Sequence, residues 1–329
     1  MAKGRTKATA EVIDFDQLEK ELIAEYGTEV ISSGANIKAP AMIPTGVFSI
    51  DKVLGGGVPQ KRITEIYGPP GSAKTALTLS LIASAQQLGG RAVFIDAERT
   101  FEEAWARKNG VDVDLLTVVT PTTGEDAYHI LLQYLRAEVD IIVLDSIANV
   151  VPSAELEGHI ADAHIGLAAR LNAKAMRKIT NENKKTAVIL VNQIRQNVTT
   201  GPFHGNPETT TGGKAIPFYS SLRLNLRKIS RIETGGEITG ANYRVKVEKA
   251  KTGGAGIHQV AEFQVDFTDG IDIANDLLKH AMSKGLVSKA GSWFTVGEKR
   301  LQGEAATKQY MKTEGLIDIW RKEFTDEST

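Results

Sequence analysis

Four short apolar runs, each with several β-branched residues, divide the middle of the chain. Their lengths of four to six residues suit strands buried on both faces, and the stretches between them have helix-like patterns. This alternation predicts an α/β fold with a largely parallel, twisted sheet and crossover helices. The runs are residues 62–67, 92–95, 141–144 and 187–191.

Before the first run, apolar residues recur at helical spacing between Phe15 and Ile23, and Gly27 supplies a stop. This pattern predicts one short amphipathic helix. Residues 28–42 have the composition of a connector, which leaves the helix free to dock on a neighbouring subunit. Packing on the protein's own core is the alternative.

Each apolar run ends in glycine or polar residues. The carboxyl ends of strands line the ligand crevice of a doubly wound sheet, so these endings should converge on one place. Buried strands alone explain the apolar runs but not their endings. The endings are Gly68-Pro69-Pro70-Gly71, Asp96 with Glu98, Asp145-Ser146 and Asn192-Gln193.

The first ending opens a glycine-containing motif that precedes the helix-compatible residues 76–87. This context predicts a P-loop, in which backbone N–H groups and a helix N-terminus bind phosphate oxygens. Lys74 would reach the terminal phosphates of ATP, and the Thr75 hydroxyl would coordinate Mg²⁺. The predicted cofactor-binding residues of the loop are Gly68, Pro69, Pro70, Gly71, Ser72, Ala73, Lys74 and Thr75.

Ala73 stands where this motif usually has a glycine before the lysine. Glycine adopts unusual backbone angles at little cost, whereas other residues do not. Either Gly71 takes the unusual angles and leaves Ala73 without strain, or Ala73 is slightly strained, at a cost of about 1 kcal/mol. We favour the first.

Three polar residues at the other endings are candidates for the chemistry of hydrolysis. Asp145 suits a carboxylate that supports Mg²⁺, although a helix cap is the alternative. Glu98 would orient or deprotonate the attacking water, or it is a surface residue of a loop. Gln193 would sense the γ-phosphate and pass its presence to the segment that follows, or it satisfies loop backbone.

At 329 residues, the chain is long enough for one large core and a small accessory module. It has no cysteine, which excludes disulfide scaffolds, thiolate zinc sites and cysteine nucleophiles. It has neither a signal-peptide pattern nor an apolar run near the ~18 residues of a membrane span. We therefore expect a soluble, cytoplasmic protein with no membrane partner.

The net charge is only −1, but the charges are segregated. Residues 11–29 carry seven acidic side chains and one lysine, whereas residues 279–312 carry seven Lys or Arg and two Glu. The basic stretch is either a solvated helical face or a surface that faces DNA.

Five sequence blocks resemble the bacterial RecA recombinase family, over a stretch from about Ile43 to about Gly303. Their order separates the chain from other P-loop proteins, and the last block is the most diagnostic. The blocks are Glu65-Ile66-Tyr67-Gly68-Pro69, Phe94-Ile95-Asp96-Ala97-Glu98, Gly166-Leu167-Ala168-Ala169-Arg170, Asn192-Gln193-Ile194-Arg195 and Gly205-Asn206-Pro207-Glu208-Thr209-Thr210-Thr211-Gly212-Gly213.

The resemblance implies the roles given above for Lys74, Thr75, Glu98, Asp145 and Gln193. It also implies that Trp105 stacks on adenine, with Glu102 and Phe267 near the nucleotide. Core packing is the alternative for Trp105, because Phe101 lies four residues before it on a plausible helix. The end of a core strand is the alternative for Phe267.

Residues 244–251 alternate as a strand would, with Val245, Val247, Lys249 and Lys251 on one face. In the family, lysines at the last two positions reach ATP bound by the adjacent subunit, which would stabilise transition-state charge. Without the resemblance, an exposed strand end is the simpler interpretation.

The resemblance further identifies two DNA loops, residues 157–165 and residues 195–214. The second is rich in Gly and Thr, and we expect it to be long and structureless. Phosphate contacts and wedges carry little sequence information, so binding of single-stranded DNA should be nearly sequence-independent. The predicted DNA-binding residues of this region are Ile165, Gly166, Arg170, Arg177, Arg195, Val198, Gly212 and Gly213.

The C-terminal part would capture double-stranded DNA through Lys289, Lys299 and Arg300, near Trp293. The resemblance implies an ATP-dependent recombinase that forms a helical homo-oligomeric filament on single-stranded DNA. A hexameric DNA motor of the same fold and an ATP-switched filament without DNA function are the alternatives. The predicted domains are a polymerisation helix with its linker (1–42), a RecA-type P-loop ATPase core (43–269) and a small α/β domain (270–329).

Overall fold

The computed structural model describes residues 13–28, 30–159, 166–196, 208–254 and 256–326. The chain falls into two compact units, residues 1–39 and residues 40–329. Across the described ranges, no helix has both the length and the apolar character that a membrane crossing requires.

The first unit contains the helix α1 (Phe15–Tyr26) and a short 3₁₀ turn, η1 (Gly34–Asn36). The carboxylate of Asp14 caps α1 by accepting a hydrogen bond from the Asp16 N–H (2.9 Å). The helix ends at Gly27, whose φ of 86° suits glycine. The helix predicted from the apolar spacing is present, and none of its residues is buried.

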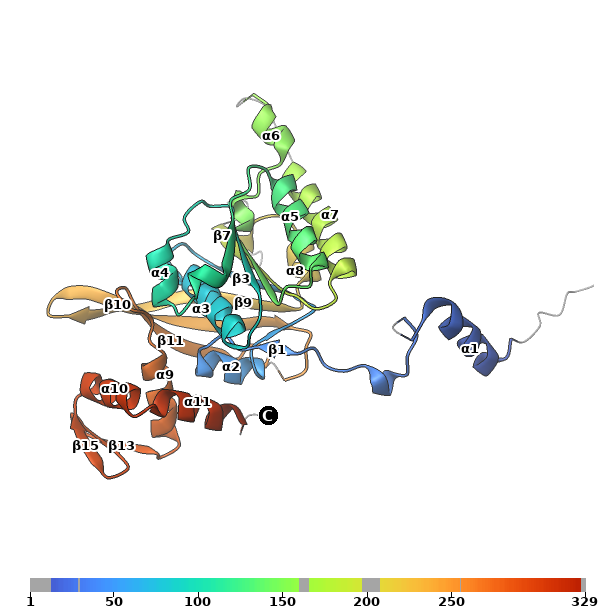
Figure 1. The fold of residues 1–329 in the computed structure, drawn as a ribbon. Coiled ribbons are helices and arrows are strands. Elements are labelled where there is room, and N and C mark those ends of the chain that lie inside the picture. Colours follow the sequence, from blue (N-terminus) through green and yellow to red (C-terminus); the bar gives the residue numbers. More distant parts are fainter. Residues whose placement is uncertain (1–12, 29, 160–165, 197–207, 255, 327–329) are drawn as a thin grey trace, which may run out of the picture. The chain divides into compact units, whose positions relative to one another are not determined.

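The second unit is built on a ten-stranded sheet (Figure 1). In chain order, its strands are β3 (Ile63–Gly68), β4 (Ala92–Asp96), β5 (Leu116–Val119), β6 (Ile141–Asp145), β7 (Ala187–Gln196), β8 (Glu208–Thr210), β9 (Leu222–Thr234), β10 (Glu237–Ala250), β11 (Val260–Asp266) and β12 (Gly270–Ile271). In space the order is β12-β11-β10-β9-β3-β7-β6-β4-β5, and β8 pairs with β7.

The strands from β9 to β5 pair in parallel, whereas β10, β11 and β12 extend the sheet in antiparallel pairing. All four predicted apolar runs lie in the parallel part, as β3, β4, β6 and β7. The prediction of an α/β fold with a largely parallel sheet is confirmed.

Both faces of the parallel strands are buried, which explains their continuous apolar runs. In β6, Ile141 and Val143 pack on one face and Ile142 and Leu144 on the other, and all four are 0 % exposed. The helices α3 (Lys74–Gln87) and α4 (Glu103–Lys108) cover the first face, and α5 (Gly124–Arg136) and α7 (Leu167–Glu182) cover the second (Figure 1). The smaller elements are β1 (Met42–Ile43), α2 (Phe48–Leu54), β2 (Val58–Pro59), η2 (Val113–Leu115), η3 (Ile147–Asn149), α6 (Ser153–Glu157) and α8 (Ala215–Tyr219).

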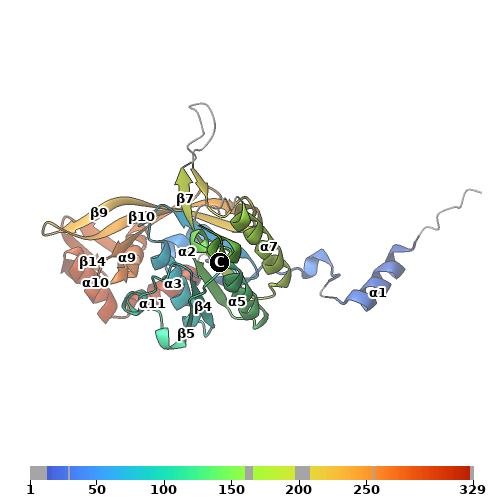
Figure 2. The ribbon, with the colours of Figure 1, turned by 90° about the horizontal axis from the view of Figure 1, so that it is seen from above.

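The C-terminal residues form a small α/β domain with a core of its own. Its elements are α9 (Ile273–Ser283), β13 (Val287–Ala290), β14 (Trp293–Val296), β15 (Lys299–Gln302), α10 (Glu304–Thr313) and α11 (Leu316–Asp326). The three strands pair antiparallel, and Figure 2 shows α9, α10 and β14 gathered on one side of the parallel strands. Phe48 of α2 packs into this core, with its ring 4.4 Å from that of His280 and 5.5 Å from that of Phe324. The predicted domain boundaries stay predictions.

Two carboxylates lie where α2 packs against α9. Asp51 Oδ1 accepts a hydrogen bond from the Thr45 N–H (2.6 Å), and Asp276 Oδ2 accepts one from the Ser49 N–H (3.1 Å). Burial raises the pKa of Asp51 to about 7, and the charge of Asp276 acts in the same direction. The folded protein therefore keeps a proton on Asp51 at pH values where the unfolded chain has lost it.

The turn between β3 and α3 takes left-handed backbone conformations at two positions, Gly71 with a φ of 67° and Ala73 with a φ of 64°. The expectation that Ala73 is free of strain is therefore wrong. In this region the Cβ of an L-residue crowds the following carbonyl. Gly68 is required for a different reason, because a Cβ there would lie 2.3 Å from the Leu226 carbonyl oxygen.

We predict that Asp51→Asn flattens the dependence of protein stability on pH. The stability that protonated Asp51 contributes is full below its ordinary pKa of 3.8 and is lost as the pH rises through about 7. The amide keeps an acceptor oxygen for Thr45 but does not titrate. Urea unfolding between about pH 5 and 8 should show a shallower decline than wild type, whose slope for one proton is at most about 1.4 kcal/mol per pH unit. The same change at the exposed Asp318 is the control, and equal slopes in wild type and Asp51→Asn would contradict the prediction.

We also predict that Gly71→Ala and Ala73→Gly have different effects on the free energy of unfolding. Gly71→Ala should lower the free energy of unfolding by about 1–2 kcal/mol through backbone strain alone, because its Cβ would meet no atom within 4 Å. Ala73→Gly should stay within about 1 kcal/mol of wild type, because relieved strain offsets the greater freedom of the unfolded chain. Ala306→Gly, at an exposed position of α10, is the matched control and should cost about 1 kcal/mol. A loss for Ala73→Gly as large as that control would show that Ala73 carries no strain.

Candidate functional site

The carboxyl ends of β3, β4, β6 and β7 meet beside a cavity of about 350 Å³. The P-loop follows β3, Glu98 follows β4, Asp145 ends β6 and Gln193 lies in β7. The predicted convergence of the four endings is therefore present. The lining residues are Pro70, Gly71, Ser72, Ala73, Lys74, Thr75, Ala76, Glu98, Trp105, Asp145, Gln193, Tyr243, Val265 and Phe267.

The P-loop side of the cavity is suited to phosphate. Lys74 Nζ donates hydrogen bonds to the carbonyl oxygens of Pro69 (2.9 Å) and Gly68 (3.2 Å), which hold the ammonium over the loop. Burial lowers the pKa of Lys74, against the opposing effect of Asp145 and Glu98. The buried Ser72 Oγ has no hydrogen-bond partner among the described residues. A phosphate at the N-terminus of α3 would give these donors an anionic acceptor.

Thr75 and Asp145 are joined in the position expected for a magnesium site. Thr75 Oγ1 donates a hydrogen bond to Asp145 Oδ2 (2.8 Å). Burial raises the pKa of Asp145 to about 6, and the hydrogen bond from Thr75 partly offsets that effect. Mg²⁺ prefers one or two carboxylates together with substrate phosphates, and these two residues fit that requirement.

Two donors bind the Glu98 carboxylate, one from β7 and one directly after β6. Gln193 Nε2 donates to Glu98 Oε1 (3.0 Å), and the Ser146 hydroxyl donates to the same oxygen (2.6 Å). Sequence reasoning did not assign a role to Ser146, although its place directly after Asp145 was a usable signal. The carboxylate proposed for water activation therefore contacts the residue proposed to sense phosphate.

The residues predicted to lie near the base are only partly brought together. Trp105 and Phe267 line the cavity, together with Tyr243 and Val265, which sequence reasoning did not select. Phe267 is 45 % exposed, and Lys228 Nζ lies 5.7 Å from its ring centroid. Glu102 is exposed just before α4 and is not part of the lining, so its role near the base stays a prediction.

Lys249 and Lys251, the two lysines predicted to reach a neighbouring ATP, do not line the cavity. Lys249 Nζ donates to the carbonyl oxygens of Pro217 (2.6 Å) and Phe218 (3.0 Å) in α8, and Lys251 Nζ lies 5.8 Å from the Phe218 ring. The expected alternation does not persist to the end of the strand, because the β9–β10 register shifts between Val247 and Lys249 and β10 ends at Ala250. In its own chain, Lys249 therefore holds the end of α8.

The predicted second DNA loop is not structureless at its two ends. β7 extends to Gln196 and β8 returns beside it, with Ile194 opposite Thr210, so the prediction for residues 195–214 is wrong for these parts. An apolar period could not reveal them, because the paired residues are mostly polar. Ile165 and Val198 lie outside the described residues.

The other predicted DNA-binding residues of this region lie on three elements. Arg195 of β7 and Arg170 and Arg177 of α7 are exposed, and Gly166 directly precedes α7. Gly212 and Gly213 have φ values of 84° and 89°, and Asn172 Nδ2 donates to the Gly212 carbonyl (3.0 Å). Their contact with DNA stays a prediction.

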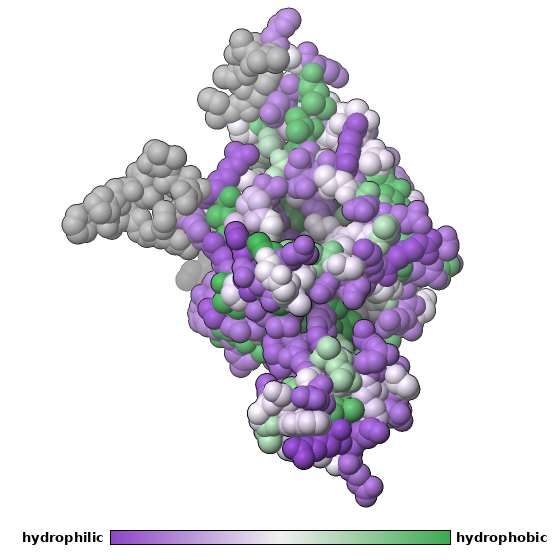
Figure 3. Space-filling model, turned by 90° about the vertical axis from the view of Figure 1, so that its left-hand side faces the viewer, coloured by the Kyte–Doolittle hydropathy of each residue, from purple (hydrophilic) through white to green (hydrophobic). Residues whose placement is uncertain are grey.

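In the C-terminal domain, two of the predicted basic residues lie over aromatic rings, that of the exposed Trp293 and that of the buried Phe294. Arg300 Cζ lies 4.7 Å from the Trp293 ring centroid, and Lys289 Nζ lies 5.0 Å from that of Phe294. Lys299 begins β15 and is exposed. Hydrophilic residues dominate the face of the molecule shown in Figure 3, and hydrophobic residues form small separate groups on it.

Two family models match the chain in succession. The RecA N-terminal domain matches residues 14–272, and the RecA C-terminal domain matches residues 275–317. "Protein RecA" of Syntrophus aciditrophicus is 46 % identical over 317 residues, which are 95 % of this chain and 91 % of that protein. "Protein RecA" of Geobacter sulfurreducens is 43 % identical over 320 residues, covering 95 % and 92 %. The chain belongs to the RecA family.

Proposed function

We propose that the protein is an ATP-dependent recombinase that forms a filament on single-stranded DNA and catalyses homologous pairing and strand exchange. Membership of the RecA family supports the recombinase function in DNA recombination and repair. The observation that carries the proposal is the hydrogen bond from Gln193 to Glu98. It joins the carboxylate beside the phosphate site to the strand that enters the predicted DNA loop.

In the proposed reaction, Glu98 orients a water for attack on the γ-phosphorus of ATP and accepts its proton. The new bond joins the water oxygen to phosphorus, the bond from phosphorus to the β-γ bridging oxygen breaks, and ADP and phosphate are released. Lys74 and the loop N–H groups hold the phosphates, and Thr75 and Asp145 would hold Mg²⁺. When bound, the ion neutralises charge on the phosphate oxygens.

The side-chain –NH₂ group of Gln193 donates to Glu98 in the described structure, and a γ-phosphate oxygen would compete with Glu98 for that group. We expect ATP binding to turn the amide away from Glu98, which frees the carboxylate for water and changes the entry to the DNA loop. ATP binding would in this way favour a DNA-binding state.

Single-stranded DNA would bind along the predicted loops, with Arg170, Arg177 and Arg195 contacting the backbone. Gly212 and Gly213 would present N–H groups to phosphates. Double-stranded DNA would bind the C-terminal domain through Lys289, Lys299 and Arg300. In a filament, α1 would dock on a neighbouring subunit, and Lys249 and Lys251 would reach that subunit's ATP.

We predict that Glu98→Gln keeps ATP and DNA binding but loses DNA-stimulated ATP hydrolysis by at least about 100-fold, the usual size of a general-base effect. The change keeps size and polarity and removes the base. Phosphate release with and without single-stranded DNA is the measurement, and Glu314→Gln, an exposed position, is the control.

The wild-type assay separates the candidate functions. ATP hydrolysis that single-stranded DNA stimulates supports the recombinase. ATP hydrolysis at the same rate with and without DNA would favour an ATP-switched filament. A hexameric motor would unwind duplexes without exchanging strands. Unchanged turnover in Glu98→Gln would remove Glu98 from its proposed role.

We predict that Lys249 acts across subunits. Lys249→Ala should depress DNA-stimulated hydrolysis in filaments while nucleotide binding by isolated subunits stays near wild type. Lys74→Ala subunits bind little ATP but still offer Lys249, so mixing the two variants should restore turnover, with a maximum near equal amounts. Lys322→Ala, at an exposed position of α11, is the matched control. If no mixture regains activity, Lys249 has only its structural role at the end of α8.

A further inference from the structure

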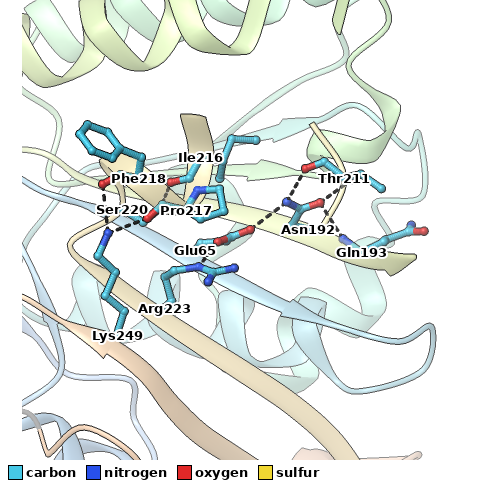
Figure 4. Close-up of polar contacts among 10 residues, drawn as sticks. All are labelled: Glu65, Asn192, Gln193, Thr211, Ile216, Pro217, Phe218, Ser220, Arg223 and Lys249. Atoms are coloured by element: carbon cyan, nitrogen blue, oxygen red, sulfur yellow. Dashed lines mark hydrogen bonds and ion pairs between the residues drawn. The ribbon is translucent and has the colours of Figure 1, made fainter. Parts of the chain in front are cut away.

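Asn192 lies between a buried ion pair and the strand that returns from the predicted DNA loop (Figure 4). It is 0 % exposed, and its side-chain oxygen and nitrogen each make two hydrogen bonds. We propose that Asn192 and Thr211, together called the loop clamp, are positioning residues. They would move the returning strand β8 when the Gln193 side-chain amide exchanges Glu98 for another acceptor. This inference rests on the proposed function and deepens it.

The inner side of the loop clamp is fixed. Asn192 Nδ2 donates to Glu65 Oε1 (2.8 Å), and Arg223 Nε donates to Glu65 Oε2 (2.5 Å). Glu65 is 0 % exposed, and the Arg223 guanidinium also lies over the Tyr67 ring, 4.7 Å from its centroid. Breaking a buried ion pair is costly because it leaves an uncompensated charge. Asn192 of β7 is therefore anchored to β3, and through Glu65 to β9.

The outer side of the loop clamp binds the returning chain at one residue. Thr211 Oγ1 donates to Asn192 Oδ1 (2.5 Å), and Asn192 Nδ2 donates to the Thr211 carbonyl (3.0 Å). The Thr211 N–H donates to the Gln193 carbonyl (3.2 Å). Thr211 directly follows β8, whose Glu208 also pairs with Arg227 of β9. Motion at residues 192 and 193 would therefore reach β8 through Thr211, in addition to the direct pairing of β7 with β8.

Gln193 connects this arrangement to hydrolysis. Its side chain donates to Glu98 (3.0 Å), and its own N–H donates to Asn192 Oδ1 (2.8 Å). The proposal requires that the backbone of Gln193 shifts when the amide exchanges Glu98 for another acceptor. Asn192 is held on its inner side, so the adjustment passes outward to Thr211. Loss of the Thr211 hydroxyl would remove one of the two side-chain hydrogen bonds that join Asn192 to Thr211.

The test uses the full chain and compares Thr211→Val with Thr211→Ser. Valine keeps the shape of threonine without the hydroxyl, whereas serine keeps the donor. Fluorescence anisotropy of a labelled oligo(dT) gives Kd with Mg²⁺ and either ADP or a non-hydrolysable ATP analogue, and the ratio of the two values measures coupling. The same Thr→Val change at Thr234, near the exposed end of the β9–β10 hairpin, is the control.

We expect Thr211→Val to lower the coupling ratio by about fivefold, the typical effect of one hydrogen bond. Thr211→Ser should stay within about twofold of wild type, and affinity for the analogue without DNA should be unchanged. A wild-type ratio kept in Thr211→Val, or an equal loss in Thr211→Ser, would overturn the loop clamp alone. If the wild-type protein binds oligo(dT) equally well with ADP and with the ATP analogue, both the proposed function and the loop clamp would be overturned.

Hydrogen exchange on the wild-type protein tests the same idea without a substitution. If the loop clamp operates, the analogue should change amide protection of the peptide containing Gln193 and of the peptide containing residues 208–211 together. Altered protection at Gln193 with none at 208–211 would contradict the proposal. This measurement keeps the inference testable even if Thr211→Val does not fold.

Discussion

The parallel pairing of β3, β7, β6 and β4 is the constraint on which the candidate site depends. Parallel strands bring their carboxyl ends to one edge of the sheet, and the register then sets which residues face each other. Gly68 pairs with Gln193, and Asp96 pairs with Asp145. A slip of one residue would turn these side chains to the opposite face. The shared cavity of the P-loop, Glu98 and Gln193 is therefore a property of the sheet.

Two kinds of buried charge lie near these strand ends: charges that a ligand would neutralise, and charges that already form an ion pair. Burial lowers the pKa of Lys74 and raises that of Asp145, so each ionised form is disfavoured in the protein alone. A phosphate beside Lys74 and a divalent cation beside Asp145 would relieve both effects, so the proposed ATP and Mg²⁺ would favour each other's binding. Glu65 and Arg223 differ, because they neutralise each other permanently and need no ligand.

Much of the fold was predictable because the central strands are buried on both faces and so appear as continuous apolar runs. The P-loop and Glu98 were identifiable because they directly follow such runs. The backbone of Ala73 was not, since a positive φ leaves no mark on the pattern of apolar residues. The pairing of β7 with β8 and the contact of Asn192 with Thr211 were missed because they join polar residues across a loop. Lys249 was assigned from a resemblance, and its contact with α8 depends on a register shift that alternation does not reveal.

The free energy of the hydrogen bond that Gln193 exchanges limits how far ATP can shift the conformational equilibrium of a single subunit. A hydrogen bond to a charged group is worth about 1.5–3 kcal/mol, which corresponds to a shift of about 10- to 150-fold in an equilibrium. Shifting a two-state equilibrium from almost entirely one state to almost entirely the other needs a change of about 10⁴-fold in the equilibrium constant. The exchange at Gln193 alone is too small for that change. In the proposed filament, contacts between subunits would supply the remainder and complete the switch.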